Sequence, residues 1–143
     1  MTAGDKRISI ASWLTRLAFF VVWVINLQCA FVFIFDPTPY AAGFQVEGVP
    51  GLAAVQGLGI AFLMWNATYP LFILRPERYR ALGIIILAQQ LIGLIGESLL
   101  LANLASGFPY LASAIARFVL FDGIGLLVMA ATFIALQITM ARN

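Results

Sequence analysis

The chain has no histidine and a single cysteine, Cys29, among its 143 residues. Intramolecular disulfides, paired-thiol relays and metal sites built from cysteine and histidine are therefore excluded. Any chemistry would have to use carboxylates, arginines, amides or hydroxyls. We accordingly expect no metal and no cofactor, and we assign no catalytic residue.

Charged residues are also scarce, at 10% of the chain against about 25% in an ordinary soluble domain. Hydrophobic residues make up 63%, and the mean hydropathy is +1.01. These values indicate an all-α membrane protein. The net charge of +2 does not indicate nucleic-acid binding, because the positive charges lie in short runs beside apolar segments, where they orient a membrane protein.

Four apolar segments are long enough to cross a bilayer, which takes about 20 residues. They predict a single domain, residues 1–143, made of four transmembrane helices at about 15–35, 52–74, 81–104 and 113–140. Pro37 and Pro39 predict a loop over residues 36–50 between the first two. The first apolar run, Leu17–Phe35, is longer than the core of a signal peptide and is followed by no small-x-small cleavage site, so we expect it to be retained.

Basic residues predict the orientation of this bundle. The segment Arg75–Arg80 places three arginines between two apolar spans, and the positive-inside rule assigns such a loop to the cytoplasm. On this topology both termini are cytoplasmic, and the loops 36–50 and 105–112 contain no Lys or Arg. Seven basic residues fall on the cytoplasmic side: Lys6, Arg7, Arg16, Arg75, Arg78, Arg80 and Arg142. We expect the protein to reside in a bacterial cytoplasmic (inner) membrane.

Polar groups inside the spans form the candidate site, because in hydrocarbon they need protein partners or a water-filled cavity. At 1.5 Å per residue, most of them lie in the outer half of the membrane, with two amides near the midplane. We expect this polar centre to open towards the outer face and to hold a ligand. Its members are Asn26, Gln28, Gln56, Asn66, Gln90, Glu97, Arg117 and Asp122.

Depth and helical direction suggest specific partners. Gln90 and Glu97 share one face of the third helix, and Glu97 is expected to pair with Arg117. Asp122 differs from Arg117 by about 140° around the fourth helix, so it is expected to bond to amides of the first helix. Two interpretations stay open: a structural ion pair that fixes helix register, or a ligand or transport site. The amides equally fit ordinary interhelical hydrogen bonds.

The outer loop and the second span, residues 35–75, carry a family resemblance together with the general plan of the chain. The resemblance depends on four short-looped helices and on the order Phe35-Asp-Pro, then Gly51, then Gln56-Gly-Leu-Gly59. In these features the chain resembles small bacterial membrane proteins of the DoxX-like group. That resemblance implies a four-helix fold and an association with quinone- or sulfur-linked redox systems in some members. Small multidrug transporters have a similar size and helix number, but they carry an essential carboxylate in the first helix, which this chain lacks.

Three classes of function follow. The first is a binding or assembly subunit that recognises a lipid, quinone or other amphipathic ligand, or a partner helix. The alternatives are a small transporter or channel using Glu97 and Asp122, and an intramembrane isomerase or cyclase using carboxylate acid–base chemistry. The expected partners are membrane lipids, a quinone- or isoprenoid-like ligand, and a partner membrane subunit or second copy, with no nucleic acid.

Overall fold

The computed structural model describes residues 3–142, and the regular structure in that range is helical. Four segments are long and apolar enough to cross a membrane: Lys6–Phe35, Gly48–Leu74, Arg80–Ala102 and Pro109–Ala141. The predicted all-helical architecture with four such segments is confirmed. The helices are α1 (Ala3–Phe35), α2 (Thr38–Gly43), α3 (Gly48–Asn66), α4 (Tyr69–Leu74), α5 (Arg80–Ala102) and α6 (Pro109–Ala141).

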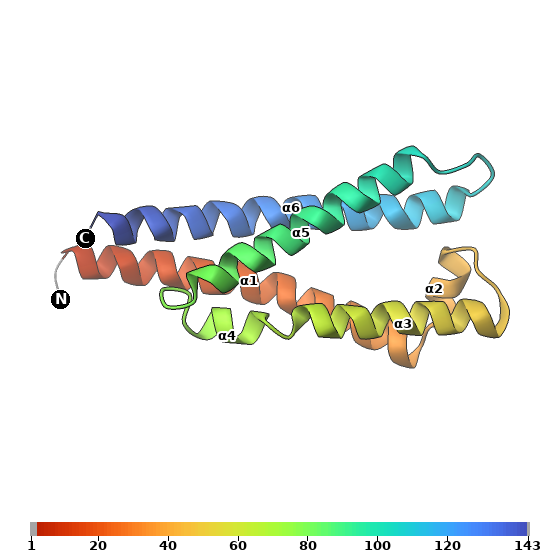
Figure 1. Cartoon of the computed structure of the whole chain (residues 1–143), viewed down its shortest axis with the longest axis horizontal. Helices are drawn as coiled ribbons and strands as arrows, with labels where there is room; N and C mark the ends of the chain where they lie inside the picture. The colour runs from red at the N-terminus through yellow and green to blue at the C-terminus, as the bar shows by residue number, and fades with distance from the viewer. Residues whose placement is uncertain (1–2, 143) are drawn as a thin grey trace.

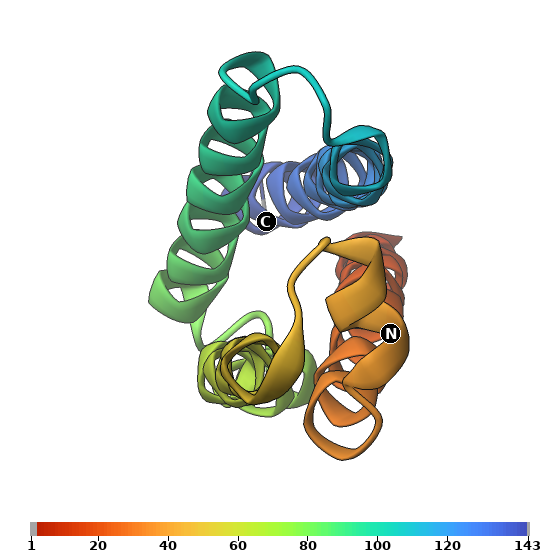
Figure 2. The same ribbon diagram turned by 90° about the vertical axis from the view of Figure 1, so that its right-hand side faces the viewer.

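The long helices run alongside one another, and α1 is the central element. It packs against α3, α4 and α6, while α5 packs on α6 and α4. Helix α1 begins and α6 ends at one end of the molecule, here called the termini end (Figure 1). Helix α2 lies at the opposite end, the α2 end, near the loops that join α2 to α3 and α5 to α6. Seen from the α2 end, α1 lies between α3 and α6, and α5 adjoins α6 (Figure 2).

The predicted loop over residues 36–50 contains a helix, so this prediction is wrong in part. Pro37 is the N-cap of α2, and Pro39 lies in its first turn. Proline is tolerated there because first-turn N–H groups have no partner within the helix. After α2, Gln45 adopts a φ of 55° and Gly48 a φ of 65°, which turn the chain back into α3. The Gln45 carbonyl Oε1 accepts a hydrogen bond from the Leu111 backbone N–H at 3.1 Å, which ties this turn to α6.

The predicted helix 52–74 is interrupted, because α3 ends at Asn66 and α4 begins at Tyr69. Pro70 explains the break, since proline has no N–H to donate to the Asn66 carbonyl and its ring crowds that group. The other boundaries also shift. Helix α1 begins at Ala3 rather than near residue 15, and α6 begins at Pro109 rather than 113.

The termini half of the bundle has a closely packed core. Phe19, Tyr69, Phe72, Ile86 and Met129 are completely buried there. The Phe19 and Phe72 rings lie 4.5 Å apart, as expected for a tilted aromatic pair. Aromatic side chains of α1, α2, α3 and α6 also gather in the α2 half, around buried Phe33. That half also contains a cavity of about 520 Å³.

Candidate functional site

A cavity of about 520 Å³ lies between α1, α2 and α6, and it is here called the α2 cavity. Its apolar wall is mainly aromatic and includes Phe44, Phe62, Phe118 and Phe121. The volume falls within the range of about 300–1,000 Å³ that is typical of small-molecule sites. Its polar side chains come from three helices: Asn26, Gln28 and Cys29 of α1, Tyr40 of α2, and Arg117 and Asp122 of α6.

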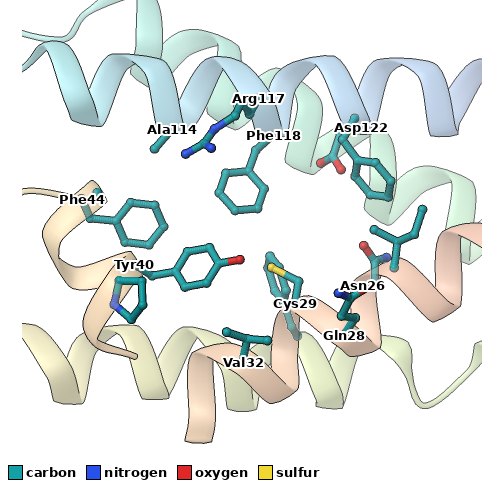
Figure 3. A pocket seen from close by; sticks show the side chains of 15 residues that line it. Asn26, Gln28, Cys29, Val32, Tyr40, Phe44, Ala114, Arg117, Phe118 and Asp122 are labelled. Carbon is teal, nitrogen blue, oxygen red and sulfur yellow. The ribbon is translucent and has the colours of Figure 1, made fainter. Parts of the chain in front are cut away.

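The polar side chains occupy different parts of this wall (Figure 3). The Tyr40 hydroxyl points into the cavity towards Cys29, and the Arg117 guanidinium points towards Ala114. Asp122 and Asn26 face each other across the opposite part of the cavity. Gln28 and Arg117 are exposed as well as lining the cavity, so the space communicates with the surface. The cavity thus has a cationic part and an acidic part.

The predicted ion pair between Glu97 and Arg117 is wrong. Within residues 3–142 the ion pair is instead Arg16–Glu77. Glu97 lines a separate small cavity of about 20 Å³ with Asn26, Asn66, Gln90 and Asp122, and its Oε2 is buried without a described partner. Helix depth was the basis of the predicted pair, but the rotation of α6 turns Asp122, rather than Arg117, towards α5.

Asp122 also has a different partner from the one predicted. Its Oδ1 accepts a hydrogen bond from Gln90 Nε2 of α5 at 2.8 Å, rather than from an amide of α1. Gly93 leaves the space for this carboxylate, since a Cβ there would lie 3.1 Å from Asp122 Oδ2. Gln90 and Glu97, which were predicted to share one face of this helix, both line the small cavity together with Asp122.

The amides of the candidate site divide between interhelical bonding and cavity lining. Asn26 Nδ2 of α1 donates to Asn66 Oδ1 of α3 at 3.4 Å, which joins these two helices as the interhelical interpretation predicts. Gln56 Nε2 donates to the Ile34 carbonyl at 3.0 Å on an exposed face, and it does not line the α2 cavity. Four of the eight predicted site residues line the α2 cavity: Asn26, Gln28, Arg117 and Asp122. The small cavity is lined by Asn66, Gln90 and Glu97, and also by Asn26 and Asp122.

Sequence reasoning missed Tyr40 and Phe44, because α2 was expected to be a loop. The signal was present in the prolines, which favour the first turn of a helix as well as the end of the preceding one. Burial, and secondarily nearby Cys29, raise the pKa of Tyr40 above its usual value, while Arg117 acts in the opposite direction. Tyr40 is therefore a protonated phenol at neutral pH and offers an O–H donor to the cavity.

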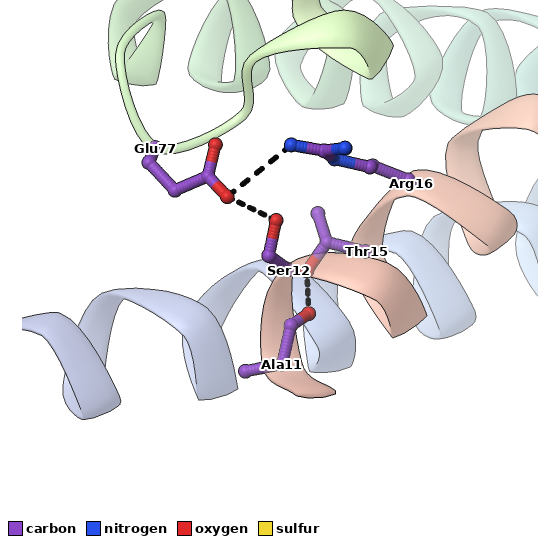
Figure 4. A network of polar contacts seen from close by, with 5 residues as sticks. All are labelled: Ala11, Ser12, Thr15, Arg16 and Glu77. Atoms are coloured by element: carbon purple, nitrogen blue, oxygen red, sulfur yellow. Dashed lines mark hydrogen bonds and ion pairs between the residues drawn. The ribbon is translucent and has the colours of Figure 1, made fainter. Parts of the chain in front are cut away.

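A second polar cluster lies at the termini end, where it ties the 75–79 loop to α1 (Figure 4). The Ser12 hydroxyl donates to Glu77 Oε1, and Arg16 Nη2 lies 3.4 Å from the same oxygen. Burial alone would raise the pKa of Glu77, but the bonds from Ser12, the backbone and Arg16 outweigh it and hold this pKa below its usual value. Thr15 Oγ1 lies 3.0 Å from the Thr132 carbonyl and connects α1 with α6. We interpret this cluster as structural.

Among the described residues, no group of three or more Cys, Asp or Glu side chains is placed to hold a metal ion. Comparisons of the chain with protein-family models, curated proteins and solved structures found no match. The resemblance to the DoxX-like group stays a prediction. The α2 cavity and the residues on its wall are therefore the basis for assigning a function.

Proposed function

We propose that the chain is an integral membrane protein of a bacterial cytoplasmic membrane, with both termini in the cytoplasm. Four helices are long and apolar enough to cross a bilayer. Of the eight Lys and Arg residues, all but Arg117 belong to α1, the 75–80 segment or the C-terminus, towards the termini end. The positive-inside rule then assigns the termini end to the cytoplasm and the α2 end to the outer side.

Within the membrane, the protein binds an amphipathic ligand with an apolar body, of the lipid or quinone kind, in the α2 cavity. The observation that supports this proposal is the cavity itself: about 520 Å³, walled by aromatic rings, with polar groups on three sides. Apolar walls with a few convergent polar groups are typical of small-molecule sites. At the outer end of a bundle, such a space is accessible to a molecule dissolved in the outer leaflet.

Transport by Glu97 and Asp122 is the second candidate. Both carboxylates line the small cavity, which shares Asn26, Phe62 and Asp122 with the α2 cavity, so a polar region extends from the larger space towards α5. Towards the termini end, however, Phe19, Phe72, Ile86 and Met129 are completely buried. Because completely buried apolar side chains fill this part of the bundle, binding is favoured over transport.

A photoactivatable long-chain alcohol carrying a diazirine tests the proposal. The probe is added to the full-length protein in phosphatidylcholine vesicles, and the labelled peptides are mapped after irradiation. Labelling is expected to concentrate in residues 25–32, 39–44 and 114–122. Labelling that is instead spread evenly over lipid-facing residues such as Leu17, Ile92 and Leu127 would contradict the proposal.

Two glycines provide a matched pair of variants for this experiment. Gly43 lines the α2 cavity, and a Cβ there would meet nothing within 4 Å, so Gly43→Phe fills the cavity without a clash at its first carbon. Gly57 of α3 has equally open surroundings but lines no described cavity. Gly43→Phe should abolish the concentrated labelling, and Gly57→Phe should leave it unchanged.

A further inference from the structure

We propose that the α2 cavity selects an oxyanion head group, a phosphate or carboxylate on an apolar chain, and that Arg117 binds it with Tyr40 as a second hydrogen-bond donor. This inference rests on the proposed ligand-binding function and names the class of ligand. It depends on the charge and the hydrogen-bonding capacity of the cavity wall.

Arg117 is the first reason. In the part of the chain that the structure describes, it makes neither an ion pair nor a side-chain hydrogen bond, although it lies within a membrane-length helix. A guanidinium offers five N–H donors and no acceptor, so whatever completes its bonding must supply acceptors. Its planar fork matches the two oxygens of a carboxylate or phosphate. An arginine that is exposed, lines the cavity and has no partner among the described residues therefore favours an anionic occupant.

Tyr40 is the second reason. Its hydroxyl points into the same space from α2 and makes no hydrogen bond among residues 3–142. Because the pKa of Tyr40 is raised, its phenol stays protonated at neutral pH, and the O–H group can donate a hydrogen bond to an acceptor. Arg117 lines the same cavity from α6. Two hydrogen-bond donors in one cavity, neither with an acceptor among the described residues, are what an oxyanion head group requires.

Asp122 determines which part of the cavity the head group of an anionic amphiphile occupies. It is five residues from Arg117 on α6, which is about 7.5 Å along the helix axis, and it already accepts a bond from Gln90. Its carboxylate repels a second anion from its own part of the cavity, which places the head group near Arg117 and α2. The apolar chain then lies against the aromatic wall, where Phe118 and Phe121 project from α6.

The same oxyanion chemistry has two sources. A single-chain amphiphile could enter the cavity, or the flexible Arg117 side chain could reach out to the head group of a bilayer phospholipid, as long basic side chains do near helix ends. Filling the cavity distinguishes these sources, because it excludes the amphiphile but leaves the bilayer interface accessible. The proposal commits to the cavity.

Three diazirine probes of equal chain length, ending in phosphate, alcohol or trimethylammonium, test it on the full-length protein in phosphatidylcholine vesicles. The phosphate probe should label the cavity about tenfold more than the alcohol probe, which corresponds to about 1.4 kcal/mol, because the guanidinium forms charge-assisted hydrogen bonds with phosphate. Arg117→Gln should abolish this preference for phosphate over alcohol. Arg117→Lys should retain part of the preference, and Arg142→Gln, at the termini end, should retain all of it.

Each contrary result has a distinct meaning. Equal labelling by phosphate and alcohol, unaltered in Arg117→Gln, would overturn the oxyanion assignment and leave the proposed ligand-binding function standing. Strong phosphate labelling that persists in Gly43→Phe would place the anion at the bilayer interface and also overturn the assignment. If Gly43→Phe reduces the cavity labelling of none of the three probes, the proposed function itself is wrong. An unchanged helix content and elution profile of Arg117→Gln in detergent would show that this variant is folded.

Discussion

Asp122 illustrates how a single carboxylate is accommodated among apolar helices. Gln90, which is 2% exposed, donates to its Oδ1, while Gly93 leaves room for its Oδ2. The remaining side of the group faces the two cavities. One hydrogen bond from Gln90 of α5 and access to a polar space thus take the place of the predicted bond to amides of α1.

Replacing Gln90 tests the value of this bond. Gln90→Leu should lower the free energy of unfolding by about 1–2 kcal/mol, since it leaves Asp122 without its donor. Gln137→Leu is the matched control, because Gln137 Nε2 is buried without a described partner, and removing an unsatisfied donor should be neutral or stabilising. Denaturant titration in detergent micelles measures both. Equal losses in the two variants would show that Gln90 contributes only packing.

Glu77 gives a pH-dependent prediction. Its pKa is lower in the folded protein than its usual value, so its contribution is fully present above the usual pKa and is lost as pH falls through the folded pKa. Glu77→Gln should therefore cost at most about 1 kcal/mol at pH 7. The difference from the parent should diminish as pH falls below the usual pKa of a glutamate, about 4.3. Unfolding curves across pH 3–8 check this, with Glu47→Gln, an exposed site at the α2 end, as the control.

At the level of helices, small residues determine how closely the elements approach. Gly59 of α3 packs directly on α1, where a Cβ would lie 2.8 Å from the Ala30 carbonyl oxygen. Backbone atoms cannot move aside as a flexible side chain can. Close approach of two helix backbones at a glycine is a common packing mode in membrane bundles.

A pair of alanine substitutions in α3 measures this constraint. Gly59→Ala should destabilise the protein by about 1–3 kcal/mol, because α3 must move away from α1. Gly57→Ala has open space and should be stabilising by up to about 1 kcal/mol through its higher helix propensity. The free energies of unfolding of the two variants should differ in sign. Two changes of the same sign would mean that α3 is not held against α1 at Gly59.

Hydropathy and segment length were sufficient to predict the four long helical segments, because both follow from residue composition. The shorter elements depend on prolines, which can either end a helix or start one. Pro39 was interpreted as a loop residue, so α2 was not predicted, and the break that Pro70 causes in the second span was not predicted either. The rotation of each helix depends on packing across the whole bundle. Residue counting predicted the depths of Glu97 and Arg117 but could not show that they line different cavities.

For the whole molecule, packing and charge are unevenly distributed along the long axis. Buried aromatic rings fill the termini half, where the Ser12, Arg16 and Glu77 cluster fixes the 75–79 loop. The α2 half contains the cavity and the remaining basic residue, Arg117. A packed aromatic core in one half and a cavity of about 520 Å³ in the other are consistent with the proposed binding of a ligand near the α2 end.

The orientation of this asymmetric molecule in the membrane is tested with two cysteines introduced in a Cys29→Ser background. Ala81 and Ala105 are exposed residues beside opposite ends of α5, and replacing either with cysteine leaves the charge distribution intact. With the termini in the cytoplasm, Ala105→Cys should react with a membrane-impermeant maleimide in cells whose cytoplasmic membrane is intact. Ala81→Cys should react only after that membrane is disrupted. Labelling of Ala81→Cys but not Ala105→Cys in intact cells would reverse the topology and place the mouth of the α2 cavity on the cytoplasmic side.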